Sequence, residues 1–129
     1  ILETKAFTVN IADAKHVVEA DYVGIASGNK EPNKMAKAGF STTKSKFVNA
    51  PIINELPMSV ECKLLKFNED GICIGEIVNV SADESVLGED GKIDPSKVEA
   101  ITFDPVHNTY IKLGEKVGNA FSDGKKLND

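Results

Sequence analysis

Few side chains in this sequence have the spacing that catalysis or metal binding requires. The two histidines, His16 and His107, lie in unrelated segments, and we interpret both as surface residues, one in a helix and one in a turn. No Ser-His-Asp order, CxxC pair or HExxH motif occurs, so neither triad hydrolysis nor a zinc site is predicted. The acidic loop 88–95 does not match the twelve-residue calcium pattern, and we predict no metal site.

Three further features each have two interpretations. Cys62 fits a small core hydrophobe better than a reactive thiol. Glu76 is acidic in an otherwise apolar segment, so it either pairs with Lys63 across two strands or stands as a carboxylate near a ligand. The segment 24–28, Gly-Ile-Ala-Ser-Gly, matches neither a dinucleotide fingerprint nor a P-loop. It is typical of a tight turn, although its spacing would also let backbone approach a ligand.

The bulk composition excludes several classes of protein. The 129 residues, 41% hydrophobic and 27% charged, suit one soluble globular domain. The net charge of -5 argues against a nucleic-acid binder, because phosphate contacts need clustered Lys or Arg. All 15 basic residues are lysines, so a phosphate clamp must use Lys, backbone N–H groups or hydroxyls. No stretch approaches the ~20 apolar residues of a membrane span, and no signal peptide is visible.

A central hairpin over residues 57–82 is the element that must position these side chains. Met58–Phe67 and Ile72–Ser81 alternate apolar and polar residues around the turn cluster Asn68–Gly71. A four-residue loop fixes the register of the two strands. The predicted pairs are Lys63 with Glu76, Cys62 with Ile77, Leu65 with Ile74, and Lys66 with Cys73.

Apolar side chains on both faces of this hairpin predict a central place in a barrel, with more chain packed outside it. The register leaves Cys62 and Cys73 four positions apart on one face. At about 3.4 Å per residue the separation is roughly 13 Å, so we predict two reduced thiols rather than a disulfide. Two isolated thiols are typical of a reducing cytoplasm, where we expect this protein to reside.

The rest of the chain is predicted to alternate short strands and short helices. The predicted strands are 6–11, 101–103 and 109–113. The predicted helices are 14–20 with Asp13 as N-cap, 33–38 ending at Gly39, one turn at 83–86, 95–100 with Pro95 in its first position, and 115–121. The predicted irregular segments are an apolar run at 21–28, a turn-like stretch at 40–49, extended chain at 50–57 and a polar tail from Lys125. Residues 1–4 read as the last turn of a helix, so we expect the chain to begin inside a larger protein.

Several segments, each weak alone, form a strong combined signal because their order and spacing cover nearly the whole chain. These segments are 5–11 (Lys-Ala-Phe-Thr-Val-Asn-Ile), 22–28 with Lys34 following, 50–55 (Ala-Pro-Ile-Ile-Asn-Glu), 60–62, 74–78 (Ile-Gly-Glu-Ile-Val), 83–92, and 113–121 (Leu-Gly-Glu-Lys-Val-Gly-Asn-Ala-Phe). Together they resemble the flavoredoxin branch of the flavin reductase-like proteins, which have an FMN-binding split β-barrel.

The resemblance implies a mainly β protein with short helices and a Greek-key split barrel, in which residues 1–129 form a single domain. That domain corresponds to the C-terminal two-thirds of the family's usual length. Members usually carry a further segment before the point that matches Ile1, which supplies the first barrel strands and the Arg, Ser and Thr positions that hold the FMN phosphate. We therefore expect a barrel that is incomplete at its N-terminus, with a free strand edge that invites pairing with another chain.

The same resemblance implies a homodimer that binds FMN non-covalently near the subunit interface. Such proteins pass electrons between the flavin and NAD(P)H or a redox partner protein, and the cofactor performs the chemistry. We therefore expect an FMN-binding oxidoreductase domain, with no nucleic-acid or membrane partner. The alternative is a non-catalytic FMN-binding or dimeric assembly module.

For this chain, the resemblance places FMN near the end of the first strand and the Ser-Gly turn. The amide of Asn10 can both donate to and accept from an isoalloxazine edge. Ser27 offers a hydroxyl and Gly28 an unobstructed backbone N–H. Lys34 would bring positive charge to the flavin phosphate or to a nicotinamide donor. The same four residues fit a strand end, a turn and a solvated helix face equally well.

Overall fold

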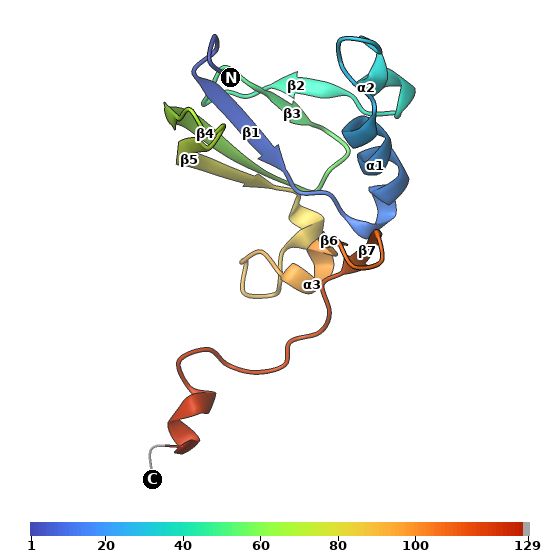
Figure 1. Cartoon of the computed structure of the whole chain (residues 1–129). Helices are drawn as coiled ribbons and strands as arrows, with labels where there is room; N and C mark the ends of the chain where they lie inside the picture. Colours follow the sequence, from blue (N-terminus) through green and yellow to red (C-terminus); the bar gives the residue numbers. More distant parts are fainter. Residues whose placement is uncertain (128–129) are drawn as a thin grey trace.

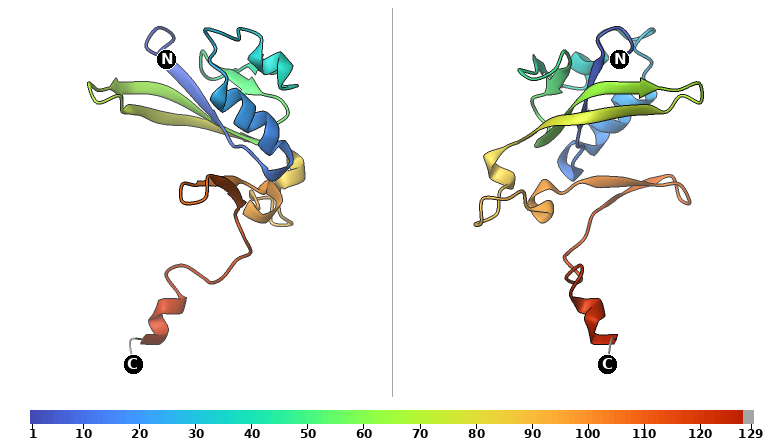
Figure 2. Two further views of the ribbon diagram at one scale, coloured as in Figure 1. Left: turned by 45° about the vertical axis from the view of Figure 1, so that its right-hand side comes forward. Right: turned by 90° about the vertical axis from the view of Figure 1, so that its left-hand side faces the viewer.

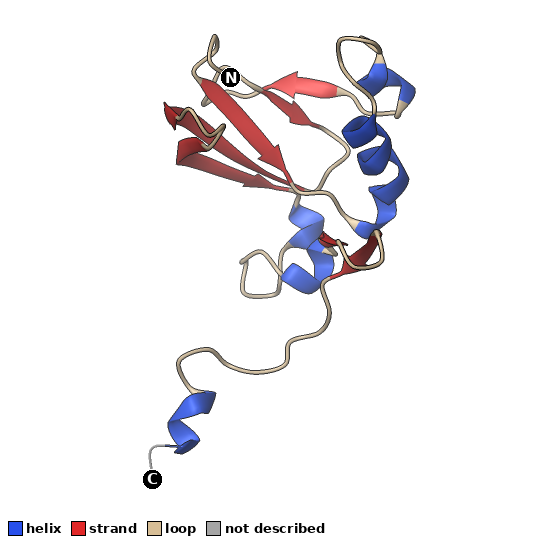
Figure 3. Ribbon diagram, viewed as in Figure 1, coloured by secondary structure: helices blue, strands red, loops and turns tan. Residues whose placement is uncertain are grey.

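A computed structural model describes residues 1–127 as a mainly β chain with short helices (Figure 1; strands are red in Figure 3). The elements in chain order are β1 (Ala6–Asn10), η1 (Ala14–His16), α1 (Val17–Ile25), α2 (Lys34–Lys37), β2 (Thr42–Lys44), β3 (Pro51–Ile53), β4 (Met58–Phe67), β5 (Cys73–Ala82), η2 (Glu84–Val86), α3 (Pro95–Val98), β6 (Ile101–Asp104), β7 (Thr109–Lys112) and η3 (Asp123–Leu127). Over these residues the strands form three separate sheets that do not close into a barrel. None of the described helices is long and apolar enough to cross a membrane.

The largest sheet has the strand order β1-β4-β5, with β4 antiparallel to both neighbours. The predicted central hairpin is therefore confirmed, since β4 and β5 form the longest strand pair. Its loop turns at Gly71, whose φ of 80° suits glycine. The Oδ1 atom of Asn68 accepts a hydrogen bond from the Ile72 N–H at 2.8 Å, which closes the loop one residue later than predicted.

The predicted hairpin register is confirmed at its middle and wrong on either side. The confirmed pairs are Lys63 with Glu76 and Cys62 with Ile77. The corrected pairs are Lys66 with Ile74 in place of Leu65 with Ile74, and Phe67 with Cys73 in place of Lys66 with Cys73. Irregularities at Glu61/Cys62 and Leu64/Lys66 cause the difference, because an extra residue in one strand shifts every later pair. Alternation alone does not reveal where such a residue lies.

The β2–β3 pair and the 45–50 loop lie over one face of the β1-β4-β5 sheet. Ala6 from β1 packs with Val48 and Ala50 of this loop, and Val78 from β5 packs against them. The segment predicted to be turn-like thus includes a short strand, β2, which pairs with β3 from Thr42–Ile53 to Lys44–Pro51.

The predicted end of the first long helix is wrong, because α1 continues to Ile25 through residues that were read as an apolar run. Asp13 caps the entry as predicted, and its carboxylate accepts from the His16 N–H at 3.0 Å. At the far end, the Lys34 ammonium donates to the carbonyls of Val23 and Ala26 at 2.8 and 2.9 Å. The last carbonyls of a helix have no hydrogen-bond partner within the helix, and here Lys34 supplies one. Because Lys34 lies 8 and 11 positions after these carbonyls, the local sequence did not indicate it as their partner.

The C-terminal part of the described chain holds α3 and the β6–β7 hairpin, both predicted. Asp94 caps α3 by accepting from the Ser96 N–H at 2.9 Å, and the helix stops at Glu99 in a left-handed conformation. Hydrogen bonds tie this part to the segment between β1 and α1. The Ile101 N–H donates to the Ala12 carbonyl at 3.1 Å, and the Ala14 N–H donates to the Glu99 carbonyl at 3.0 Å.

The predicted helix at 115–121 is wrong. Residues 113–119 have no regular secondary structure, and only the short η3 follows (Figure 2). An isolated helix this short is marginal without packing partners, and Gly118 in its interior weakens it further. The predicted polar tail is helical over Lys125–Leu127, and its last residues, 128–129, lie outside the described part.

Candidate functional site

The face of the β1-β4-β5 sheet that lies under β3 and the 45–50 loop carries polar side chains in two cross-strand rows. Directly opposed residues of an antiparallel pair project to the same side. The first row is Asn10, Ser59 and Ser81, and the second is Thr8, Glu61 and Asn79. Ser59 and Glu61 are only 3% and 0% exposed, so this part of the interior is polar rather than apolar.

Glu61 is the centre of this polar face. The Ser45 hydroxyl donates to its Oε2, while Asn79 Nδ2 and the Ser81 hydroxyl donate to Oε1 at 2.7 and 2.5 Å. Burial by itself would raise the pKa of the Glu61 carboxyl, but these hydrogen bonds together hold that pKa below its ordinary value. The charged form of Glu61 therefore ties β4 and β5 to the loop that covers them.

Sequence reasoning missed Glu61, and the reason is the bulge beside it. The predicted register placed Glu61 opposite Val78, whereas the structure pairs it with Asn79. The available signal was the spacing of two between Ser59 and Glu61 and again between Asn79 and Ser81. It becomes a cluster only once the strands are paired correctly.

Asn10 lies at the end of β1 and connects that strand to β3. Its Oδ1 accepts from the Ile53 N–H at 3.0 Å, and its Nδ2 donates to Thr8 Oγ1 at 3.1 Å. The Thr8 hydroxyl in turn donates to the Pro51 carbonyl. One N–H of the Asn10 amide remains available for a ligand.

Ser59, the cross-strand neighbour of Asn10, has a buried hydroxyl without a hydrogen-bond partner among residues 1–127. It lines a cavity of about 190 Å³ that Ile53, Asn54 and Ser81 also line. A buried hydroxyl that makes no hydrogen bond is costly, so it marks a place where a ligand or water group is expected. Two polar groups at this end of the sheet are therefore free to bind a ligand within the described chain: the second N–H of the Asn10 amide and the Ser59 hydroxyl.

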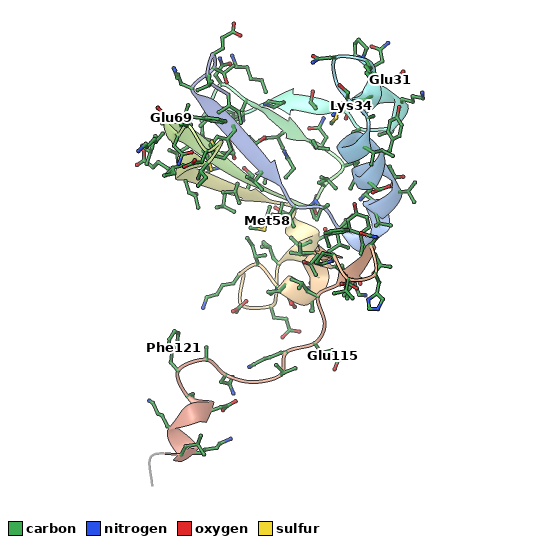
Figure 4. All side chains as sticks on the ribbon, in the orientation of Figure 1. Glu31, Lys34, Met58, Glu69, Glu115 and Phe121 are labelled. Carbon is green, nitrogen blue, oxygen red and sulfur yellow. The ribbon has the colours of Figure 1, made fainter. Side chains whose placement is uncertain are left out.

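Ser27, Gly28 and Lys34 come together at the C-terminal end of α1. Ser27 and Gly28 are exposed, and no atom lies within 4 Å of a Cβ added at Gly28. Lys34, labelled in Figure 4, is half-buried, and two of its three N–H groups donate to the carbonyls of Val23 in α1 and of Ala26 just after the helix. Asn10 precedes the other end of α1, and nine helical residues span about 14 Å. The structure therefore groups three of the four predicted residues and places the fourth apart.

His16 is not the surface residue that we predicted. Its Nδ1 lies 2.7 Å from Asp13 Oδ1, and the two side chains are only 15% and 13% exposed. The His16 ring also packs near Phe40, with centroids 6.0 Å apart. His107 is exposed in the β6–β7 turn, as predicted. Among residues 1–127, no group of three His, Cys, Asp or Glu side chains could hold a metal ion.

The two thiols behave as structural residues, whereas Lys63 and Glu76 are exposed cross-strand neighbours. Both cysteines lie in strands, as predicted, and both are free thiols. Burial, and to a smaller extent the nearby Cys73, raises the pKa of the Cys62 thiol, which makes it less reactive. Lys63 and Glu76 face each other on adjacent strands, as predicted, but both are exposed and no ion pair within the described chain joins them.

Comparison with known proteins defines the class. Residues 1–102 match the model of the flavin reductase-like domain, so the chain belongs to the flavin reductase-like family. The fold is the split barrel expected from the sequence. Its three described sheets do not close on one another, as expected for a barrel that is incomplete.

Within the family, the chain is similar to flavoredoxins. It shares 42% identity and a TM-score of 0.91 with the flavoredoxin of Desulfovibrio vulgaris (Miyazaki F), over 96% of this chain and 67% of that one. The flavoredoxin from Methanosarcina acetivorans gives 28% identity and a TM-score of 0.87, over 98% and 68%. An FMN-binding domain of a flavin reductase-like enzyme from Shewanella baltica OS155 shares the fold, at 16% identity and a TM-score of 0.77, over 92% and 65%.

Curated relatives extend beyond the matched region. An uncharacterised protein from Aquifex aeolicus (strain VF5) is 32% identical over 104 residues, which cover 78% of this chain and 53% of that protein. A second, from Archaeoglobus fulgidus, is 33% identical over 97 residues, covering 73% and 53%. The chain thus spans about half the length of the curated relatives that it matches.

The polar groups of the site fit part of a flavin. The Ser59 hydroxyl lines the cavity, and the spare N–H belongs to Asn10, its cross-strand neighbour, which is not among the lining residues. Both groups suit the carbonyl and imide groups of an isoalloxazine edge, and Ile52, Leu56 and Met58 give the cavity apolar walls. At about 190 Å³, however, the cavity lies below the 300–1,000 Å³ that is usual for ligand pockets. It has room for one edge of a ring, so a whole flavin needs a further surface.

Proposed function

We propose that this chain is part of an FMN-binding, flavoredoxin-like oxidoreductase that transfers electrons between a reduced donor and the flavin. The observation that carries this proposal is the similarity to the Desulfovibrio flavoredoxin, at 42% identity and a TM-score of 0.91 over 96% of the chain. NAD(P)H or a redox partner protein would act as the donor or acceptor, and the free thiols support a cytoplasmic location.

Bound FMN would supply the redox chemistry, since flavins accept either a hydride or single electrons. The residues of the chain would bind and orient it. Asn10 and Ser59 would hold the polar edge of the ring, and the hydrogen bond from the Ile53 N–H fixes the Asn10 amide in position. Ser27, Gly28 and the remaining N–H of Lys34 would approach the phosphate at the other end of α1.

We further propose that the protein is a homodimer with FMN near the subunit interface. The small size of the Ser59 cavity supports this arrangement, because a second surface must complete the site. So does the sheet face opposite the polar rows, where the apolar side chains of Val9, Ile77 and Val80 are 46%, 64% and 43% exposed.

FMN titration followed by flavin fluorescence tests the site. It is carried out on residues 1–129 and on the same chain preceded by the N-terminal segment of the Desulfovibrio flavoredoxin. We expect Asn10→Ala and Ser27→Ala each to raise the Kd more than about threefold, roughly 0.6 kcal/mol. Asn49→Ala, an exposed residue of the 45–50 loop, is the matched control and should leave the Kd unchanged.

The melting temperature of each variant is measured in parallel, because Asn10 also holds β3. A weaker Kd at unchanged melting temperature supports a direct contact with FMN. If neither substitution weakens binding, the site is misplaced. If neither form of the protein binds FMN, the proposed function is wrong.

The non-catalytic module remains the second candidate, and the exposed apolar sheet face supports it. Anaerobic addition of NADH or NADPH to the FMN-loaded protein separates the two. Bleaching of the flavin absorbance is expected for the oxidoreductase. Bleaching by dithionite but by neither nucleotide would favour the module or a protein electron donor.

A further inference from the structure

After β7 the chain continues as an arm, residues 114–127, which leads away from the rest of the described structure (Figures 1 and 2). Its apolar side chains are fully exposed. Val117 and Phe121 are 102% and 98% exposed, and Leu127 is 88% exposed. Single exposed apolar residues are common, but three occur together on this projecting segment. Covering them with another apolar surface would lower the free energy.

Hydrogen bonds within the tip of the arm hold its turn, and the apolar side chains of the arm pack on no other part of residues 1–127. Asp123 Oδ2 accepts from the Asn119 N–H at 2.8 Å, and the Asp123 N–H donates to the Asn119 carbonyl at 3.1 Å. Phe121 sits within this turn at a φ of 60°, a conformation that is unfavourable for a bulky residue. The turn therefore holds a phenyl ring outward at a local cost that no contact within residues 1–127 offsets.

The body of the chain has an apolar groove that fits such a ring. Ile11, Met58, Ile93, Val98, Ala100 and Leu113 line it, and its volume is about 250 Å³. An apolar cavity of about 150 Å³ is enough to bind benzene in another protein, so the groove has room for a phenyl side chain. Figure 4 shows Met58, on the wall of the groove, well apart from Phe121 of the same chain.

We propose that the arm docks on a second copy of this chain, with Phe121 in that copy's groove. Leu113 lines the groove and the arm begins at the next residue, so the arm leaves its own groove at the edge. In a two-fold dimer each copy supplies one arm and one groove, and both contacts form together.

Charge supports a second copy as the occupant. The 83–94 segment, which contains Ile93 of the groove, has five acidic residues and one lysine. The tip of the arm, 119–127, has two lysines, Lys125 and Lys126, and one aspartate. The approach of the positively charged tip to the acidic 83–94 segment is electrostatically favourable. Complementary charges of this kind raise the rate of association more than they raise the affinity.

This inference rests on the proposed homodimer but can fail separately from it. Sedimentation equilibrium of the full chain gives the dimer Kd. We expect Phe121→Ala to raise that Kd about 30-fold or more, because each dimer loses two buried aromatic anchors. Phe47→Ala, at an exposed phenylalanine outside the arm, is the matched control and should leave the dimer Kd unchanged.

Photo-crosslinking identifies where the arm binds. With benzoylphenylalanine in place of Phe121, we expect crosslinked dimers whose joined peptides contain Met58 or Ile93. A crosslink within one chain would show that the arm folds back. A crosslinked dimer joined elsewhere, or no crosslink, would overturn the groove assignment.

The combined outcomes separate the two proposals. If the chain is a dimer and Phe121→Ala leaves its Kd unchanged, the arm proposal is wrong and the homodimer stands. If the chain is monomeric throughout the concentration range, both are wrong, while FMN binding is judged from its own titration.

Discussion

Glu61 shows how a single buried charge is accommodated in this small domain. Removing a carboxylate from water is costly unless several strong hydrogen bonds replace its hydration. Ser45, Asn79 and Ser81 supply three, from the covering loop and from β5. Charge-assisted hydrogen bonds are about twice as strong as neutral ones, so the network also fixes where the loop sits.

We predict that Glu61→Gln destabilises the protein by about 1–3 kcal/mol near pH 7, because one amide replaces two charged acceptor oxygens. Urea denaturation measures this change. The exposed loop residue Glu69, changed to Gln, is the matched control and should have little effect. An unchanged midpoint for Glu61→Gln would show that the network adds no stability.

The same residue predicts a pH dependence. The pKa of Glu61 is lower in the folded protein than its ordinary value of 4.5, so the unfolded chain binds more protons just below that pH. Stability from this group is complete above pH 4.5 and is lost as the pH falls through the lowered pKa. Urea midpoints from about pH 6 downward should therefore fall less steeply for Glu61→Gln than for wild type. Parallel curves would contradict this assignment.

At the scale of elements, β1 and β5 pack through a glycine. The Phe7 ring of β1 reaches over β4, and a Cβ built on Gly75 would lie 2.5 Å from Phe7 Cζ and 3.1 Å from Cys62 Cβ. Real Cβ atoms do not approach so closely, so the ring occupies the space that glycine leaves. Gly24 in α1 is the opposite case, with nothing within 4 Å of an added Cβ.

We therefore predict opposite effects for two chemically identical substitutions. Gly75→Ala should lower the free energy of unfolding by about 1–3 kcal/mol, because the Phe7 ring must move. Gly24→Ala should raise it by about 0.5–1 kcal/mol, because alanine favours the helix. Chemical denaturation of both variants tests the pair, and a stabilising Gly75→Ala would show that the ring moves freely.

At the scale of the whole molecule, the chain leaves two kinds of surface open. The β1-β4-β5 sheet has unpaired edges at β1 and β5 within the described chain, and one of its faces exposes apolar side chains. Open edges and apolar faces are surfaces on which another chain adds. The relatives, which are longer, have more chain with which to cover them.

We predict that the protein is a homodimer at micromolar concentration, as measured by light scattering. Replacing the 64% exposed Ile77 by Lys should shift the population toward monomer, because it places a charge on the apolar face. Lys66→Ala on the same hairpin is the control. Monomeric wild-type protein would contradict the dimer and leave the apolar face for a different partner.

The sequence by itself determined the features that depend on neighbouring residues. These features are the caps at Asp13 and Asp94, the turn at Gly71 and the strands β6 and β7. They depend on residues only a few positions apart, so their interactions form independently of the rest of the chain. The central hairpin and its middle register followed from alternation, and the family from the order of segments. The grouping of the site residues around FMN remains a prediction.

The tertiary structure alone decided features that join distant positions. The two strand irregularities changed which residues face each other, and only then did Glu61 meet Ser81, 20 positions away. Lys34 donates to carbonyls at the end of α1, 8 and 11 residues before it. The His16 side chain is only 15% exposed, and the Phe40 ring, 24 positions later in the sequence, lies beside it. Whether a side chain is buried, and which group it hydrogen-bonds, depends on residues that are distant in the sequence. A short stretch of sequence therefore does not determine either property.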